Sequence, residues 1–167
     1  ALASYAAELV AATTEPGDAD PVVFDALREA LFALLSSREP ELVVWGFVLR
    51  YLERHGTGPQ LEGCVICGGE LQGDVTAMVE LGGCVCPRCA GNIHERGMEL
   101  SAPARSALAT LQRLPADRVG RLRLNDRARL QIRELLRRHV HCHLAVSLKS
   151  EAFLCKLGWP ALENRPV

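Results

Sequence analysis

Two pairs of cysteines constrain the fold of this chain more than any other feature. Two residues separate Cys64 from Cys67 and Cys86 from Cys89, and eighteen residues lie between the pairs. Zinc binds four thiolates in a tetrahedron, and a two-residue spacing lets one tight turn supply two sulfurs. The spacing therefore predicts one structural Zn²⁺, held by Cys64, Cys67, Cys86 and Cys89 with no open coordination position.

The segment that carries these cysteines is rich in glycine and poor in large apolar residues. Nine of the fourteen glycines lie between Gly56 and Gly91. Apolar and polar residues alternate from Val75 to Leu81, which is the period of a β-strand, and Gly82-Gly83 favours a turn. We therefore expect a small zinc-ribbon-like module over residues 58–94. Metal binding contributes roughly 10–16 kcal/mol in zinc-finger peptides, enough to fold a segment with almost no core.

The ligand set has alternatives. Cys84 lies two residues before Cys86, and His94 lies five residues after Cys89. The spacing of Cys86 to Cys89 mirrors the first pair, which favours Cys86 as the ligand and Cys84 as a small apolar residue of the strand. A redox-active pair is the other use of this spacing, but no βαβ pattern accompanies it. Seven cysteines without a signal peptide favour a reducing compartment over a disulfide scaffold.

The rest of the chain reads as helices. Asp20-Pro21 and Asn125 are helix-start signals, and Gly56 is a helix-end signal. The apolar stripe of the second helix is expected to face a core, and consists of Phe24, Leu27, Leu31, Leu34 and Leu35. The predicted helices cover residues 1–13, 21–35, 39–55, 101–114, 125–148 and 150–158.

The predicted fold class is mainly α, a helical bundle with an embedded small β module. The expected parts are an N-terminal helical part (1–57), the zinc-binding module (58–94) and a C-terminal helical part that completes the bundle (95–167). A third helix that is apolar around much of its circumference is expected at the centre of the bundle.

Charge is distributed unevenly along the chain. Residues 1–62 carry ten acidic and four basic side chains, whereas residues 63–167 carry ten acidic and fifteen basic ones. Arg129, Arg133 and Arg137 recur every four residues and predict a basic ridge on the long helix. Such a row is either a solvated face or a set of guanidinium groups that contact phosphates. With Lys149, these arginines are the candidate residues for binding DNA or an acidic peptide.

His139, His141, Cys142 and His143 form a second group of possible metal ligands. His139 and His143 share a helix face, but no carboxylate stands in the register of a hydrolytic H-E-x-x-H site. Histidines of a core or an interface are the favoured interpretation.

Several functional classes are excluded or unsupported. The chain has no apolar run long enough to span a membrane and no signal peptide. It contains no nucleophile elbow, P-loop or dinucleotide fingerprint, so no enzymatic activity is expected. Because Ala1 is not an initiating Met, we expect the sequence to be the interior of a longer chain.

The order of these parts resembles the RecO family of bacterial recombination mediators. The likeness rests on Gly56-x-x-Pro59, on Cys64-x-x-Cys67-Gly68, on Gly82-Gly83-x-x-Cys86-x-x-Cys89-Ala90, and on the final Leu148-Lys149-Ser150-x-x-Phe153-Leu154. It covers essentially the whole chain. The residues that it carries over by motif are the four cysteines, as zinc ligands.

The resemblance implies a cytoplasmic, nucleoid-associated bacterial protein of DNA repair. Members bind DNA mostly through an N-terminal OB-fold barrel, which we expect to be absent from the residues given. They act with RecR and help RecA replace single-stranded DNA-binding protein, whose acidic C-terminal tail docks on the helical domain. From charge and periodicity, we place that tail near Arg133, Arg137 or Lys149. A zinc and thiol redox-responsive interaction module is the alternative function.

Overall fold

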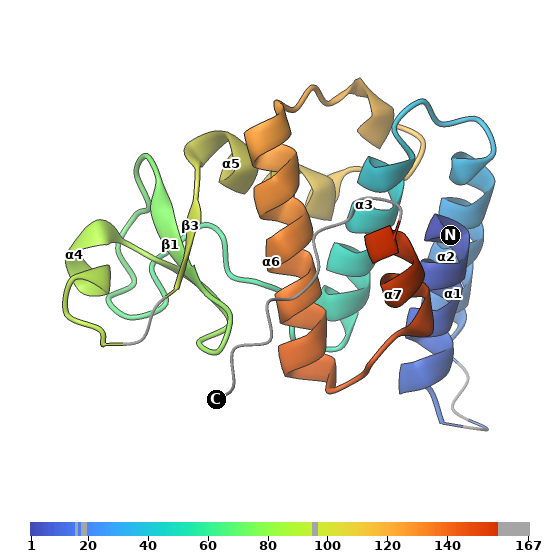
Figure 1. The fold of residues 1–167 in the computed structure, drawn as a ribbon, viewed down its shortest axis with the longest axis horizontal. Helices are drawn as coiled ribbons and strands as arrows, with labels where there is room; N and C mark the ends of the chain where they lie inside the picture. Colours follow the sequence, from blue (N-terminus) through green and yellow to red (C-terminus); the bar gives the residue numbers. More distant parts are fainter. Residues whose placement is uncertain (16, 18–19, 95–96, 157–167) are drawn as a thin grey trace.

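A helical body and a small β module make up this protein in a computed structural model (Figure 1). The structure describes residues 1–15, 17, 20–94 and 97–156. In these residues the fold is mainly α, as predicted. The helices are α1 (Leu2–Thr13), α2 (Pro21–Leu34), α3 (Pro40–Arg54), α4 (Pro87–Ala90), α5 (Ala102–Arg113), η1 (Val119–Arg121), α6 (Asp126–Leu144) and α7 (Lys149–Lys156).

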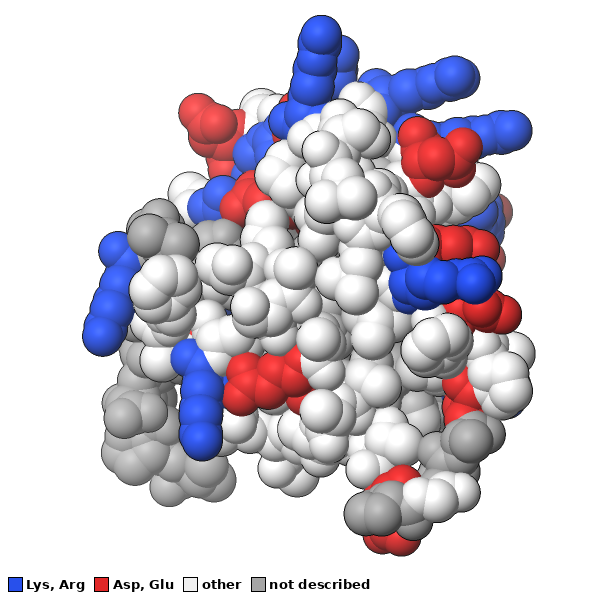
Figure 2. Space-filling view, turned by 90° about the vertical axis from the view of Figure 1, so that its right-hand side faces the viewer, with Lys and Arg blue, Asp and Glu red and all other residues white. Residues whose placement is uncertain are grey.

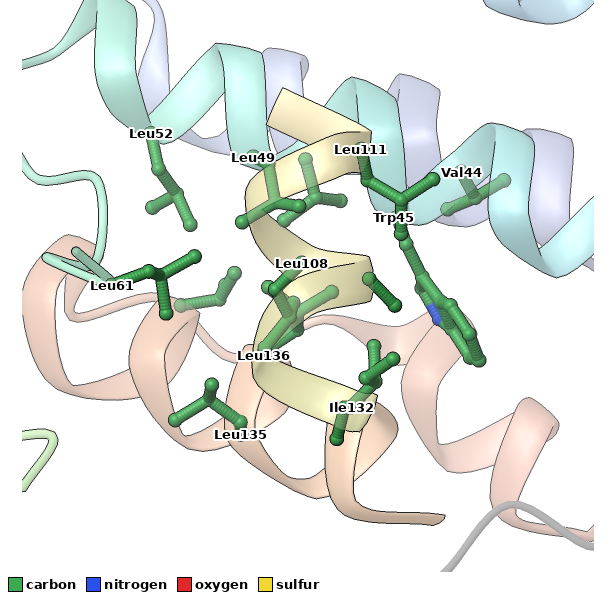
Figure 3. Close-up of a cluster of buried hydrophobic side chains, with 14 of the residues drawn as sticks. Val44, Trp45, Leu49, Leu52, Leu61, Leu108, Leu111, Ile132, Leu135 and Leu136 are labelled. Atoms are coloured by element: carbon green, nitrogen blue, oxygen red, sulfur yellow. The ribbon is translucent and has the colours of Figure 1, made fainter. Parts of the chain in front are cut away.

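Helix α3 lies at the centre of the body because it is apolar on nearly every side. It contacts α1, α2, α5, α6 and η1. On one side Trp45, Leu49 and Leu52 of α3 meet α5 and α6 (Figure 3). Each large apolar side chain buried in this way contributes about 1.5–3 kcal/mol, so α3 organises most of the core. Among the described residues, no helix combines the length and the apolar character needed to cross a bilayer.

The helix boundaries follow the capping signals of the sequence. The Asp20 carboxylate accepts hydrogen bonds from the amides of Val22 and Val23 at the start of α2. The Asn125 side chain accepts one from the Ala128 amide at the start of α6. After α3, Gly56 has a φ of +69°, a left-handed conformation that glycine adopts without strain. These three predicted signals are confirmed.

The last helices differ from the sequence prediction. Helix α6 ends at Leu144 instead of continuing to residue 148, because Ala145 is left-handed with a φ of +51°. Helix α7 then begins at Lys149, where the Glu8 carboxylate of α1 accepts hydrogen bonds from the amides of Lys149 and Ser150, each at 2.8 Å. The expected end of this helix near residue 158 lies outside the described residues.

The stripe of α2 is only partly turned toward the core, contrary to expectation. Val23 and Ala30 are the buried residues of this helix. Phe24 and Leu35 of the predicted stripe are exposed, and so is Phe32. Helix α2 therefore packs on the core with Val23, Ala30 and the partly buried Leu27 and Leu34, and leaves other large apolar side chains at the surface.

The β module contains an antiparallel three-stranded sheet. Its strands are β1 (Val75–Met78), β2 (Gly83–Val85) and β3 (Met98–Leu100), in the order β2-β1-β3. Strand β1 is shorter than the alternating pattern, which extends to Leu81. Strand β3 lies in the range assigned to the C-terminal helical part (95–167), before the helix predicted from residue 101, so the sheet extends past residue 94. It packs beside α6, which joins the module to the body.

Candidate metal centre

The four predicted cysteines come together at the end of the module that lies away from the helical body. Cys64 and Cys67 occupy a tight turn, in which the Gly68 amide donates to the Cys64 carbonyl at 2.8 Å. Gly68 has a φ of +69°, which a side chain would strain. Cys86 follows β2 and caps α4, and Cys89 lies within α4. Two separate turns therefore present two sulfurs each.

The spacing of the sulfurs suits a metal ion. All four Sγ atoms lie within 4.8 Å of one another, and those of Cys67 and Cys86 are 3.9 Å apart. A tetrahedral zinc site with Zn–S bonds of about 2.3 Å requires sulfurs roughly 3.8 Å apart. The group can therefore hold a metal ion such as zinc.

Backbone amides favour the thiolate form of the first pair. Burial opposes ionisation of Cys64, but the amides of Cys86, Cys67 and Ile66 lower the pKa of its thiol to about 6. The Gly69 amide lowers the pKa of Cys67. Hydrogen bonds to thiolates are a regular feature of metal sites, because they stabilise the ligand charge.

The thiol of Cys89 differs from those of the first pair because its hydrogen-bond partners are other cysteine sulfurs. Hydrogen bonding to Cys86 and Cys67 raises the pKa of Cys89 to about 12. The exposed Arg88 guanidinium lies near Cys67, and this sulfur raises the pKa of Arg88. The cluster therefore favours a cation at its centre, which would allow all four thiols to ionise.

The two alternative ligands are not part of the cluster. Cys84 is buried in β2, where burial raises the pKa of its thiol to about 11. His94 is exposed and does not belong to the group of candidate ligands. Cys84 instead packs as a small apolar residue, in agreement with the sequence interpretation.

Two histidines of α6 lie where the body meets the module. Nε2 of His139 lies 2.6 Å from the Thr57 carbonyl oxygen, and Nε2 of His143 lies 2.7 Å from that of Val79. His139 is fully buried, and burial lowers its pKa. Neither histidine belongs to a metal group among the described residues, which fits their interpretation as core or interface residues.

Arg105 is an attachment residue that the sequence analysis missed. Its guanidinium donates from α5 to the carbonyls of Leu61 and Leu71, at 3.3 and 2.9 Å. The module is also packed tightly at Gly83, where an added Cβ would lie 2.6 Å from the Gln60 carbonyl oxygen. No local pattern distinguishes Arg105 from the other arginines of the chain.

The three arginines of the predicted ridge lie in ion pairs. Arg129 contacts Glu39 at 2.7 Å, and Arg133 contacts Glu41 at 2.6 Å. These contacts tie α6 to the start of α3. The ridge is therefore largely covered by carboxylates instead of facing solvent.

The remaining two candidate residues lie near α7. The Arg137 side chain is only 2% exposed and contacts Glu134 at 3.0 Å and Glu151 at 3.7 Å. Lys149 is exposed, and its amide is bound by Glu8. The structure brings Arg129 and Arg133 together around Glu41, but does not bring Arg137 or Lys149 into that group.

The fold and the site define a class of protein, a mainly helical chain with an inserted four-cysteine metal-binding module. Residues 1–152 match the family model described as "Recombination protein O C terminal". The chain therefore belongs to the RecO family of DNA repair proteins.

Curated relatives support this membership. The "DNA repair protein RecO" of Pelotomaculum thermopropionicum is 36% identical over 156 residues, which cover 93% of this chain and 60% of that protein. The protein of the same name from Moorella thermoacetica is 30% identical over 173 aligned positions, covering 100% of this chain and 64% of the relative. The chain thus spans less than two thirds of the length of these relatives.

Proposed function

We propose that this chain is the partner-docking part of a non-enzymatic recombination mediator. In this role it helps load recombinase onto single-stranded DNA that is coated with single-stranded DNA-binding protein. DNA, RecR and the acidic tail of the coating protein are direct partners, and RecA is affected indirectly. One Zn²⁺, held by the four cysteines, has a structural role. Membership in a DNA repair family supports this proposal.

The observation that carries the docking role is the exposed apolar face of α2. Phe24, Phe32 and Leu35 are 65%, 67% and 82% exposed. This side of the molecule has a broad uncharged surface (Figure 2). A hollow of about 370 Å³ lies here, lined by Phe24, Leu27, Arg28, Leu31, Phe32 and Leu35. Exposed apolar surface grouped on one helix is typical of an interaction site.

The surroundings of this face suit a peptide with acidic residues and an apolar end. Arg28 borders the hollow, and its partner Asp25 is as exposed as Arg28 itself. Such an exposed pair contributes about 0–1 kcal/mol, so an incoming carboxylate can replace Asp25 at little cost. A second hollow adjoins this face and is lined in part by Arg28, Phe32 and Ala116.

The α2 face suits the acidic tail better than the surface near Arg133, Arg137 or Lys149 that the sequence analysis proposed. Around Arg133 and Arg137, the carboxylates of Glu41, Glu134 and Glu151 already occupy the guanidinium groups. An acidic tail would have to displace these carboxylates. On α2, an apolar end finds open surface.

Fluorescence anisotropy with a labelled acidic tail peptide tests this assignment. Phe32→Asp should weaken binding about tenfold or more, because it places a like charge in an apolar contact. Phe153→Asp on α7 is the matched control, since Phe153 is also an exposed phenylalanine on a helix. Equal affinities of the two variants would contradict docking on α2. Concentration-dependent self-association that Phe32→Asp abolishes would assign the face to a second copy instead.

A redox response is the second candidate function, and the exposure of Cys67 favours it. Cys67 is exposed, whereas Cys64 is buried. An accessible thiolate is the form that oxidants attack. Loss of zinc and of free thiols under mild peroxide would support this function, and retention of one zinc per chain would contradict it.

A further inference from the structure

Four exposed arginines gather at one end of the helical body. Arg38 belongs to the α2–α3 connection, whereas Arg118, Arg121 and Arg123 belong to the segment between α5 and α6. The two segments meet there, since a Cβ added to Gly120 would lie 4.0 Å from Ser37 Oγ. Both lie at the upper end of the body in Figure 1, and basic side chains project from that end in Figure 2. We call these four residues the arginine cluster.

Several other surface arginines differ from the cluster because they pair with carboxylates. Arg113, Arg127 and Arg138 pair with Glu62, Glu99 and Glu134, respectively. Within the part of the chain that the structure describes, no member of the arginine cluster forms an ion pair with a carboxylate. Arg123 donates to the carbonyls of Gly120 and Leu122, which orients it without neutralising its charge. Asp117 and Asp126 flank the segment and are exposed.

The segment that carries the cluster is anchored to the core. Val119 is fully buried beside the exposed Arg118, and Ala116 is buried as well. Arg50 of α3 donates from Nη1 to the Leu114 carbonyl at 2.8 Å, which fixes the start of the segment. The backbone is thus held in place before a ligand arrives, so less conformational entropy is lost on binding.

We infer that the arginine cluster binds the phosphate backbone of DNA. Guanidinium groups match phosphate geometry through paired N–H donors, and unpaired ones need not first release a carboxylate. Neither segment that carries the cluster contains an aromatic residue to stack on bases. We therefore expect contacts to phosphates, which do not depend on the base sequence. This inference rests on the proposed role in DNA repair and adds a DNA surface distinct from the α2 face.

Anisotropy of a labelled 20-base-pair duplex at several salt concentrations tests the inference. The triple variant Arg118→Gln, Arg121→Gln, Arg123→Gln should bind about tenfold or more weakly at low salt. The slope of log affinity against log salt should fall by about 3, roughly one for each lost phosphate contact. The control triple Arg113→Gln, Arg127→Gln, Arg138→Gln removes the same charge from paired positions and should change affinity less than about threefold. Thermal unfolding of both triples verifies that they are folded.

Three results would overturn the inference. The first is undetectable duplex binding by the unaltered chain at low salt. The second is an equal loss in both triples, which would indicate a response to net charge alone. The third is a loss of tail-peptide affinity in the first triple with unchanged DNA affinity, which would assign the arginines to the tail site and leave the proposed docking function intact. If Phe32→Asp loses tail binding but binds the duplex normally, this result would support two separate surfaces, the α2 face for the tail and the arginine cluster for DNA.

Discussion

The helical body and the β module bury apolar surface to very different extents. The body places Trp45, Phe47 and a series of leucines around α3, all almost fully buried. The module contributes fewer large residues, among them Leu61, Met78 and Leu100, and these join the same continuous core. Its outer end instead contains the four cysteines. The inner side of the module is therefore held by packing, whereas we expect a metal ion bound by the four sulfurs to hold the outer end.

The largest effect is expected from removal of the metal, which should disorder the outer end of the module and leave the helical body folded. Cys64→Ser is expected to reduce bound zinc from about one ion per chain to about none, because three thiolates leave the tetrahedron incomplete. Elemental analysis gives the metal content, and amide hydrogen exchange shows which residues lose protection. Exchange should rise in residues 62–72 and 84–91, while α3 and α5 remain protected.

Cys142→Ser is the matched control, because Cys142 is an exposed cysteine of α6 outside the cluster. An ordered outer end with no bound metal in Cys64→Ser would contradict the division proposed for the module. So would a complete loss of helical signal, because α3 is packed by α1, α2, α5, α6 and η1 and not by the metal site alone.

The next largest effect is expected from truncation inside the body. Leu108 of α5 is fully buried between α3 and α6 (Figure 3). Leu108→Ala should lower the free energy of unfolding by about 2–5 kcal/mol, through lost burial and a residual cavity. Phe24→Ala removes a larger side chain but from the exposed face of α2, and should change stability by less than about 1 kcal/mol. Urea denaturation measures the free energy of unfolding of both variants. Similar losses in the two would show that the side chain of Phe24 is buried and not exposed.

The sequence predicted the features that depend on neighbours in the chain. The cysteine pairs, the Asp20 and Asn125 caps and the glycine after α3 are each specified within a few residues. Strand β3 was missed because three residues are too few to show an alternation of apolar and polar side chains. The strand forms through its pairing with β1. The ion pair of Arg129 was missed because Glu39 lies 90 residues away. Whether a charged row is solvated or paired is decided by packing, which local spacing does not encode.

The smallest effect is expected at the join between body and module, and it depends on pH. Burial lowers the pKa of His139 in the folded protein, so the unfolded chain binds a proton first as the pH falls. The contribution of neutral His139 to stability is therefore complete above its unfolded pKa of about 6.5 and declines below it. The ring of His143 is tilted against that of His139, with centroids 4.2 Å apart, and its charge further disfavours protonation of His139. His139→Gln should be less stable at pH 7.5 but should lose less additional stability between pH 7 and 5. Urea denaturation at each pH measures this difference, and His141→Gln on the exposed side of α6 is the control. Parallel pH profiles for the unaltered chain and both variants would show that stability does not depend on protonation of His139.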